Sequence, residues 1–349
     1  MSSARPMTRQ CWRRTDDFTP GTPNLKLVTE PLPAKLSPYQ ILIKVHAVAL
    51  NYRDANISNG CNPWPITPKG VIGNDAAGEV IEAGEAVRRF KVGDRVAPNT
   101  DTENITGREA KRSWLAADED GVLADYLVFD EWKVARLPTH LDWVQASVLP
   151  CAGVMAWSAL KGLQVGQTVL IQGTGGVAMF AIKIAQAAGH RVILTSSSDD
   201  KLSKIQKLFA AAPILTVNYK NPTWHEEVLH LTDGEGVDVV LENGGTGSLV
   251  RSVQCTRRGA IVSQVGYLEK QDPAELADLL PTLIDRRVSL RGINAGSVQD
   301  LQDLSTAVSV MKMDFSDIID VVFPFSESEE ALVYLWKGRQ VGKIVIKLD

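Results

Sequence analysis

A glycine-rich turn carries the clearest chemical pattern in the sequence. Residues 168–178 read Thr-Val-Leu-Ile-Gln-Gly-Thr-Gly-Gly-Val-Ala, which is an apolar strand, a turn and the start of a helix. In the spacing Gly173-x-Gly175-x-x-Ala178, the first glycine permits a tight turn and the second lets a pyrophosphate approach the backbone. The small third residue allows close strand–helix packing. Because a helix N-terminus attracts phosphate, the pattern predicts a dinucleotide site, with glycine serving turn geometry alone as the alternative.

The end of the next predicted strand, Arg191–Ser196, indicates which dinucleotide binds. NAD-binding folds usually carry an Asp or Glu near this point, where it bonds the ribose hydroxyls. Here Ser196 and Ser197 offer hydroxyls that can donate to a 2′-phosphate, and Lys201 can neutralise its charge. These residues favour NADP(H) as the cofactor.

The same segment allows two other interpretations. Ser198 is suited to cap the following helix, with Asp199 and Asp200 favourable in its first turn. Alternatively, Asp199 binds the ribose of NAD, which would reverse the cofactor preference.

Compact apolar segments that alternate with helical patterns begin after about Pro138. Such segments are typical of a parallel sheet covered by helices on both faces, so they predict a doubly wound α/β domain with a six-stranded parallel sheet. The predicted strands are Thr168–Gln172, Arg191–Ser196, Ile214–Val217, Val237–Leu241, Ala260–Val265 and Val288–Ile293. The segment 287–293 should form the edge of this sheet. Because exposed edges are commonly covered by pairing, it predicts a homodimer.

The first third of the chain is rich in short alternating segments, glycine and proline, which predicts a small β-rich barrel. The last fifty residues read as helix, strand, helix and strand, and we expect them to rejoin that barrel. The domains are therefore predicted as 1–137 with 298–349, and 138–297. The polar stretch 99–122 is long for a loop, and long loops are usually functional or mobile.

Composition excludes several classes of protein. Hydrophobic residues make up 44% and charged residues 22%, as in a globular chain rather than a disordered one. The net charge is −4 and no long run of Lys and Arg occurs, so we expect no nucleic-acid partner. No apolar run approaches the length of a membrane span, and the N-terminus lacks a signal pattern. The four cysteines form no CxxC pair, which indicates free thiols in a cytoplasmic protein.

Taken in order, several motifs make the chain similar to the zinc-independent, quinone oxidoreductase-like branch of the medium-chain dehydrogenase/reductase superfamily. The resemblance covers nearly the whole chain. The motifs are Leu50-Asn51-Tyr52-Arg53-Asp54, residues 73–80 (Gly-Asn-Asp-Ala-Ala-Gly-Glu-Val), Gly84 and Val87 before Gly93-Asp94-Arg95-Val96, Leu149-Pro150-Cys151-Ala152-Gly153, the glycine turn, and Val217-Asn218-Tyr219.

This resemblance implies a GroES-like barrel, a Rossmann domain, a cleft between them and hydride transfer from a nicotinamide. It places Lys201 and Tyr219 near the 2′-phosphate of NADP, and Asn243 and Gly266 near the cofactor's flank and nicotinamide end. The glycine turn adds a run of backbone contacts to the cofactor, from Gly173, Thr174, Gly175, Gly176 and Val177.

The departures from the family pattern concern zinc. Zinc-dependent relatives carry their catalytic ligands at the positions of Asn51, Asn74-Asp75 and Cys151, and of these a typical ligand remains at Cys151. Two amides and one thiol make a poor tetrahedral zinc site, so we expect no metal. Cys151 is then a small buried apolar residue. The relay hydroxyl of zinc alcohol dehydrogenases would fall at Arg53, which cannot serve as one.

Without a metal, hydrogen-bond donors must stabilise the oxyanion that develops during hydride transfer. Tyr52 and Asn51 are the best candidate donors, although Tyr52 could instead be a packing residue. An α,β-unsaturated carbonyl or a quinone suits such a site, which predicts an NADPH-dependent, metal-independent reductase of a small-molecule enone, quinone or other carbonyl compound. The alternatives are an alcohol dehydrogenase or carbonyl reductase working without zinc, an enoyl reductase serving a biosynthetic partner, and a non-catalytic NADPH-binding protein.

Overall fold

The computed structural model describes residues 5–15, 17–268 and 271–348. It divides the chain into two compact units. The first unit combines Met1–Val154 with Ala295–Asp349, and the second comprises Met155–Asn294. Residues 138–154, which we expected in the second domain, therefore lie in the first unit.

The second unit contains a six-stranded parallel sheet, and the predicted strands are confirmed. In spatial order the strands are β10 (Ile214–Asn218), β9 (Arg191–Ser196), β8 (Thr168–Gln172), β11 (Val237–Glu242), β12 (Thr256–Gln264) and β13 (Ser289–Gly292). The strand order reverses direction beside β8, where doubly wound sheets bind their ligands. As predicted, β13 lies at one edge of the sheet.

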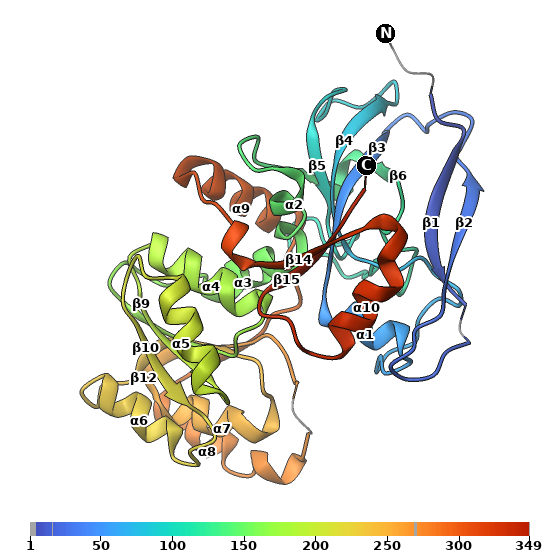
Figure 1. Cartoon of the computed structure of the whole chain (residues 1–349). Helices are drawn as coiled ribbons and strands as arrows, with labels where there is room; N and C mark the ends of the chain where they lie inside the picture. The colour runs from blue at the N-terminus through green and yellow to red at the C-terminus, as the bar shows by residue number, and fades with distance from the viewer. Residues whose placement is uncertain (1–4, 16, 269–270, 349) are drawn as a thin grey trace. The chain divides into compact units, whose positions relative to one another are not determined.

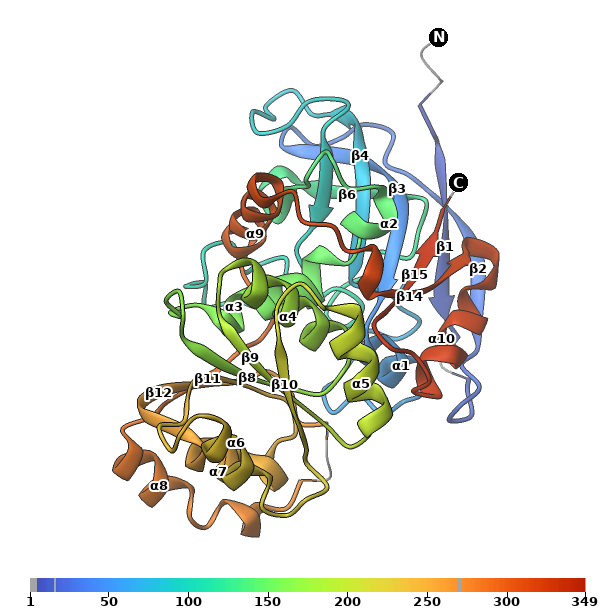
Figure 2. The same cartoon turned by 60° about the vertical axis from the view of Figure 1, so that its left-hand side comes forward.

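Helices cover both faces of this sheet. On one face, Figure 2 shows α4 (Gly176–Ala187) and α5 (Asp199–Leu208). On the other face it shows α6 (Trp224–Leu231), α7 (Thr246–Gln254) and α8 (Leu279–Arg286). Gly189, at a φ of +74°, follows the end of α4, where a glycine readily adopts the left-handed conformation that terminates a helix.

The first unit is built on a seven-stranded sheet and a two-stranded ribbon (Figure 1). The ribbon pairs β1 (Thr8–Arg14) with β2 (Leu25–Pro31). The sheet runs β14 (Ile319–Pro324), β15 (Lys343–Lys347), β3 (Gln40–Leu50), β4 (Asp75–Ala83), β5 (Arg95–Pro98) and β7 (Val134–Arg136), and β6 (Tyr126–Asp130) also pairs with β3. The helices are α1 (Tyr52–Ser58), α2 (Trp143–Ala146), α9 (Val298–Met311) and α10 (Ser328–Trp336). Helix α3 (Val154–Leu160) contains the boundary in sequence between the two units. The end of the chain returns here, since β15 pairs with β3.

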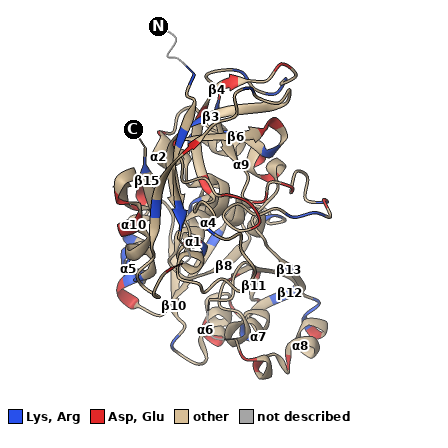
Figure 3. Cartoon of the chain, turned by 90° about the vertical axis from the view of Figure 1, so that its right-hand side faces the viewer, with Lys and Arg blue, Asp and Glu red and all other residues tan. Residues whose placement is uncertain are grey.

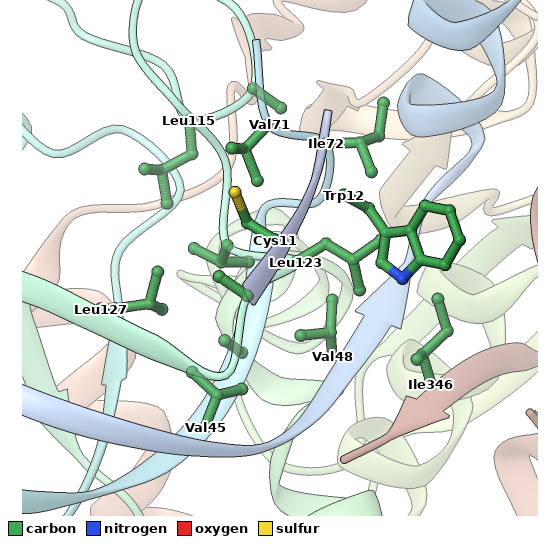
Figure 4. Packing of buried hydrophobic residues seen from close by; sticks show 14 of the residues in the cluster. Cys11, Trp12, Val45, Val48, Val71, Ile72, Leu115, Leu123, Leu127 and Ile346 are labelled. Carbon is green, nitrogen blue, oxygen red and sulfur yellow. The ribbon is translucent and has the colours of Figure 1, made fainter. Parts of the chain in front are cut away.

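The core of the first unit brings together residues distant in sequence. Figure 4 shows side chains from the ribbon, β3 and β15 packed with others from intervening loops. Cys11, Val48 and Ile346 are almost completely buried in this cluster. The Trp12 indole also donates a hydrogen bond to the carbonyl of Phe325, at 2.9 Å. This packing holds the ends of β3 and β15 in fixed register.

Charged side chains cross the β1–β2 ribbon, which the sequence patterns did not predict. Arg9 and Arg13 of β1 both contact Glu30 of β2, and Arg9 Nη2 lies 3.0 Å from Glu30 Oε2. Arg13 also pairs with Asp120 at 2.6 Å. The bonds from Arg13 and then Arg9 lower the pKa of Glu30 to about 2. The ribbon is therefore held by ion pairs in addition to its backbone bonds.

The stretch 99–122 is anchored to the first unit at both ends. Asn99 and Thr102 are buried at its start, and Leu115 is buried near its end. The hydroxyls of Thr102 and Ser113 both donate to Glu119, with the Ser113 bond at 2.6 Å. Hydrogen bonds of this kind tie the start of the loop to its end.

Charges of both signs are interspersed along the elements (Figure 3). No helix among the residues that the structure describes is long and apolar enough to cross a membrane. The four cysteines are free thiols, as predicted.

Candidate functional site

A buried polar cluster in the first unit gathers residues from three strand ends. Asn51 follows the last residue of β3, Asp75 begins β4 and Lys343 begins β15. The antiparallel pairing of Ile344 with Leu50 continues by one step to set Lys343 opposite Asn51. Asp75 is fully buried and the Lys343 side chain is 3% exposed. The strand register thus positions a lysine, a carboxylate and an amide together.

Hydrogen bonds close this cluster into a ring. Lys343 Nζ donates to Asn51 Oδ1 at 2.7 Å and to Asp75 Oδ2 at 3.2 Å. Asn51 Nδ2 donates to Asp75 Oδ2 and to Asn74 Oδ1, both at 2.9 Å. Because an ammonium can only donate and a carboxylate can only accept, the orientation of the Asn51 amide is determined. Both of its N–H groups are engaged within the cluster.

Burial governs the protonation of the acidic groups around this ring. It raises the pKa of Cys151 to about 12, so the thiol stays protonated and behaves as the predicted small buried residue. Burial also raises the pKa of Asp75, against the opposing effect of the Lys343 ammonium. Asp54, one turn into α1, has its pKa raised by burial to about 6 and accepts a bond from the Asn51 backbone N–H at 2.7 Å.

Tyr52 and Arg53 follow Asn51 at the start of α1. The Tyr52 side chain is 53% exposed, so its hydroxyl is accessible. Arg53 donates to the carbonyl of Leu115 at 2.8 Å, and its guanidinium lies over the Trp114 ring, 4.8 Å from the centroid. Arg53 therefore ties α1 to the 99–122 loop, and Trp114 anchors that loop.

In the second unit, the glycine turn has the open geometry that a phosphate needs. Gly173 adopts a φ of +86°, which favours glycine, and no atom lies within 4 Å of the Cβ position at Gly173 or Gly175. Gly175 caps α4 with no side chain bonded to the first-turn amides, so the amides of the turn Thr174–Val177 face open space. Ala178 is buried against the strand, as the motif predicts.

Three consecutive serines, Ser196, Ser197 and Ser198, lie at the end of β9, and Ser198 is also the N-cap of α5. Ser196 is buried and Ser197 is half-buried. Ser198 accepts a hydrogen bond from the Lys201 backbone N–H at 3.3 Å, so its predicted capping role is confirmed. The side chain of Lys201 is half-buried on the first turn of α5. Asp199 is exposed, and its Oδ1 accepts a bond from Asn218 Nδ2 at 2.9 Å.

A pocket of about 180 Å³ opens within the second unit beside this turn. Three predicted cofactor residues line it: Gly173, Tyr219 and Asn243. Gly266 lies beside Asn243, since a Cβ built on it would be 3.2 Å from Asn243 Oδ1. The other predicted residues (Thr174, Gly175, Gly176, Val177, Ser196, Ser197 and Lys201) are not among the lining residues of this pocket.

Sequence reasoning missed further residues that line the pocket, notably Gln172, Trp224 and Arg251. Trp224 begins α6 and Arg251 lies on α7, so they come from helices that no motif marks. Gln172, in contrast, directly precedes Gly173, and a polar residue ending an apolar strand is a signal that could have found it.

The buried carboxylate of Glu242 is hydrogen-bonded to several residues that line this pocket. Glu242 accepts hydrogen bonds from Gln172 Nε2 at 2.6 Å and from the Ser248 hydroxyl at 2.5 Å. The backbone N–H of Gly244 donates to it at 2.8 Å. Gln172 Oε1 in turn accepts from the Asn243 N–H at 2.9 Å. Glu242 thereby orders several lining residues at once.

Comparison with known proteins identifies the same architecture. Residues 37–139 match the model of the alcohol dehydrogenase GroES-like domain, and residues 176–311 match that of the zinc-binding dehydrogenases. A zinc-type alcohol dehydrogenase-like protein of Schizosaccharomyces pombe is 35% identical over 343 residues, covering 95% of this chain and 98% of the relative. A quinone oxidoreductase of Pseudomonas aeruginosa is 31% identical over 248 residues, or 70% of each chain.

Among solved structures, a protein named as an alcohol dehydrogenase from Sinorhizobium meliloti 1021 superposes with a TM-score of 0.85 at 34% identity. The match covers 98% of this chain and 99% of that one. The family models and these relatives identify an oxidoreductase of the class that uses a nicotinamide cofactor. The chain belongs to the medium-chain dehydrogenase/reductase superfamily.

Proposed function

We propose that this protein is an NADPH-dependent reductase of an activated C=C bond or a quinone and that it works without a metal. The observation that carries the proposal is the chemistry at the positions where zinc-dependent relatives hold their catalytic ion. Here those positions contain two amides, a carboxylate paired with Lys343 and a single buried thiol.

Zinc does not fit these residues. Tetrahedral zinc sites use thiolate, imidazole or carboxylate ligands. The Asn51 and Asn74 amides are weak ligands, which leaves Cys151 as a single thiol at these positions. Asp75 is occupied by an ammonium that would also repel a dication. Among the residues that the structure describes, no group of three or more His, Cys, Asp or Glu side chains could hold a metal ion.

The second unit, in contrast, fits a dinucleotide phosphate. Its glycine turn presents free amides and open space, as a pyrophosphate requires. NADP(H) is favoured over NAD(H) because β9 ends at Ser196 and is followed by Ser197 rather than by an acid. Lys201 and Tyr219 are assigned to the 2′-phosphate, and Asn243 and Gly266 to the flank and nicotinamide end.

The reaction adds hydride to an electrophilic carbon and leaves negative charge on an oxygen. NADPH, when bound, supplies the hydride. The Tyr52 hydroxyl donates a hydrogen bond to the developing enolate or phenolate oxygen and is the source of its proton. Asn51 does not donate to the substrate in this scheme, because both of its N–H groups are engaged. It holds the start of α1, and thus Tyr52, in place.

The test is NADPH oxidation, followed by its absorbance, against a panel of quinones, enones and aldehydes with and without a chelator, and with NADH in parallel. We expect turnover of enones or quinones that is insensitive to chelation and faster with NADPH. Loss of activity on chelation would contradict the metal-free mechanism, and turnover of aldehydes alone would favour a carbonyl reductase. Binding of NADPH without turnover of any panel member would contradict the proposed reaction.

We further propose that the protein is a cytoplasmic homodimer formed through β13. This strand is at the sheet edge, with Leu290 40% exposed. On the neighbouring helix α8, Leu280 and Ile284 are 69% and 76% exposed, one helical turn apart. An unpaired edge beside apolar side chains is suited to continue the sheet across a two-fold axis.

A further inference from the structure

A lysine ammonium is buried where a metal cation would be expected from the family pattern. Lys343 reaches the Asn51–Asp75 pair from β15, and the two residues of its closest bond are 292 positions apart in sequence. The side chain is 3% exposed and its Asp75 partner is fully buried. No sequence motif links Lys343 to Asn51 or to Asp75.

Stability alone is a weak reason to keep such a pair. Removing two charges from water carries a desolvation cost that often exceeds their attraction, and apolar replacements of similar volume are frequently as stable. The Lys343 side chain could have been replaced by an apolar one on β15, whose next three residues (Ile344, Val345 and Ile346) are all buried and apolar. A buried lysine at the first position of this strand therefore calls for another explanation.

The hydrogen bonds of Lys343 act on the residue that precedes Tyr52. Its bond to Asn51 Oδ1 fixes the amide, whose N–H groups then bond Asp75 and Asn74. The Asn51 backbone N–H is held by Asp54. Asn51 is thus restrained through its side chain and its main chain, and it forms the cap from which Tyr52 begins α1.

We propose that Lys343 is a positioning residue of the reaction site. Its buried ammonium, held by Asn51 and Asp75, fixes the Asn51 cap from which α1 begins, and thereby fixes the Tyr52 hydroxyl that donates to the developing oxyanion. A donor that is already held in place needs no reorganisation when the charge develops. The inference rests on the proposed function, because it assigns the oxyanion to Tyr52.

The experiment uses the full-length protein and compares Lys343→Met, Lys343→Arg and the double variant Lys343→Met/Asp75→Asn with the wild type. Lys347→Met is the matched control, since Lys347 is an exposed lysine at the other end of β15. Lys343→Met alone leaves Asp75 buried without its partner, so we expect a lower urea midpoint. The double variant removes both charges, keeps an amide oxygen for Asn51, and should recover most of that midpoint.

Turnover separates positioning from folding. We expect kcat of the double variant to fall by about a hundredfold, as for loss of an oxyanion-stabilising group, with the KM for NADPH unchanged. Lys343→Arg keeps the charge and should retain more activity than the double variant, while Lys347→Met should equal the wild type. A double variant with a wild-type urea midpoint and wild-type kcat would overturn the proposal.

A second readout does not depend on turnover. Binding of p-nitrophenolate, a mimic of the oxyanion, is measured by calorimetry in the presence of NADP⁺. We expect about tenfold weaker binding in the double variant and no change in Lys347→Met, because a Tyr52 hydroxyl that is no longer held in place loses most of its hydrogen bond to the phenolate. If the wild type turns over no substrate but shows this difference, the proposed reaction fails and the role of Lys343 stands. Equal phenolate binding, or none in either protein, overturns the role of Lys343.

Discussion

The chemistry proposed for this protein is concentrated in a few side chains with unlike surroundings. Tyr52 is 53% exposed, whereas the adjacent Asn51 is engaged by three partners in a buried ring. An accessible hydroxyl beside a rigid support is a suitable arrangement for donating a proton to a bound substrate.

Replacement of Tyr52 by Phe removes the hydroxyl and keeps the ring. We expect kcat with an enone or quinone to fall about a hundredfold, because a hydrogen-bond donor to the oxyanion is lost. NADPH affinity, measured by fluorescence, should not change. Tyr39→Phe is the control, since Tyr39 is equally exposed at 51% and lies in the same unit. If both variants retained the wild-type kcat, Tyr52 would have no part in the reaction.

Lys201 is the residue on which the preference for NADPH most depends. Its replacement by Ala should weaken NADPH binding roughly tenfold or more, because a hydrogen bond between charged groups is lost. NADH binding should be nearly unaffected, since NADH lacks the 2′-phosphate. Titration calorimetry measures both, with Lys204→Ala, an exposed lysine of the same helix, as control. Equal losses for the two cofactors would refute contact with the 2′-phosphate.

At the scale of elements, strand ends and helix starts determine where the site residues lie. The register of β15 against β3 sets Lys343 opposite Asn51, and the turn after β8 leaves the N-terminus of α4 open. The β1–β2 ribbon packs its apolar face into the core of the first unit, where Cys11 and Trp12 are buried. Its charged residues form the network around Glu30.

Glu30→Gln should destabilise the protein at pH 7 by about 1–2 kcal/mol, a value reduced for partial solvent exposure. Because Arg13 and Arg9 lower the pKa of Glu30 to about 2, its stabilising effect is present above the ordinary carboxylate range and is lost as the pH falls toward 2. Urea unfolding at pH 7 and pH 3 should therefore give a smaller difference between wild type and variant at pH 3.

The control for this prediction is Glu85→Gln. Glu85 pairs with Lys35 at 4.0 Å and both side chains are largely exposed, so the substitution should change stability very little. A difference between wild type and Glu30→Gln that stays constant from pH 7 to pH 3 would contradict the ion-pair interpretation.

At the scale of the whole molecule, assembly is the property that these surfaces predict. β13 lies at the edge of the parallel sheet, and α8, the helix that precedes it in the chain, carries exposed apolar side chains. The unpaired N–H and C=O groups of such an edge favour aggregation unless another chain covers them.

Light scattering at micromolar concentration should give twice the 38.0 kDa mass of the chain. Ile284→Glu should give the monomer mass, because it places a charge in the interface. Val165→Glu is the control, at a position of the same unit that is 83% exposed and distant in sequence from β13. A monomeric wild type would exclude the proposed dimer.

Much of the fold and part of the site could be predicted because their determinants are local. Apolar runs predicted all six strands of the parallel sheet, and the Gly173–Ala178 spacing predicted the turn. The β1–β2 ribbon was missed, since β1 reads Thr-Arg-Gln-Cys-Trp-Arg-Arg without regular alternation, and its arginines pair with Glu30 of a strand elsewhere in the sequence. The pocket residues Trp224 and Arg251 were missed because they lie on helices whose faces depend on the packing of the sheet.

The sequence by itself determined the family, the glycine turn, the serines and lysine beside it, and the loss of zinc ligands at Asn51 and Asn74. Each of these depends on residue type at short spacing. Only the tertiary structure shows that Lys343 lies among the residues at those ligand positions. Lys343 and Asn51 are 292 residues apart, and no periodicity or motif connects them. They meet because β15 pairs with β3 in one register, and that register is set by the burial of an apolar core drawn from the whole first unit.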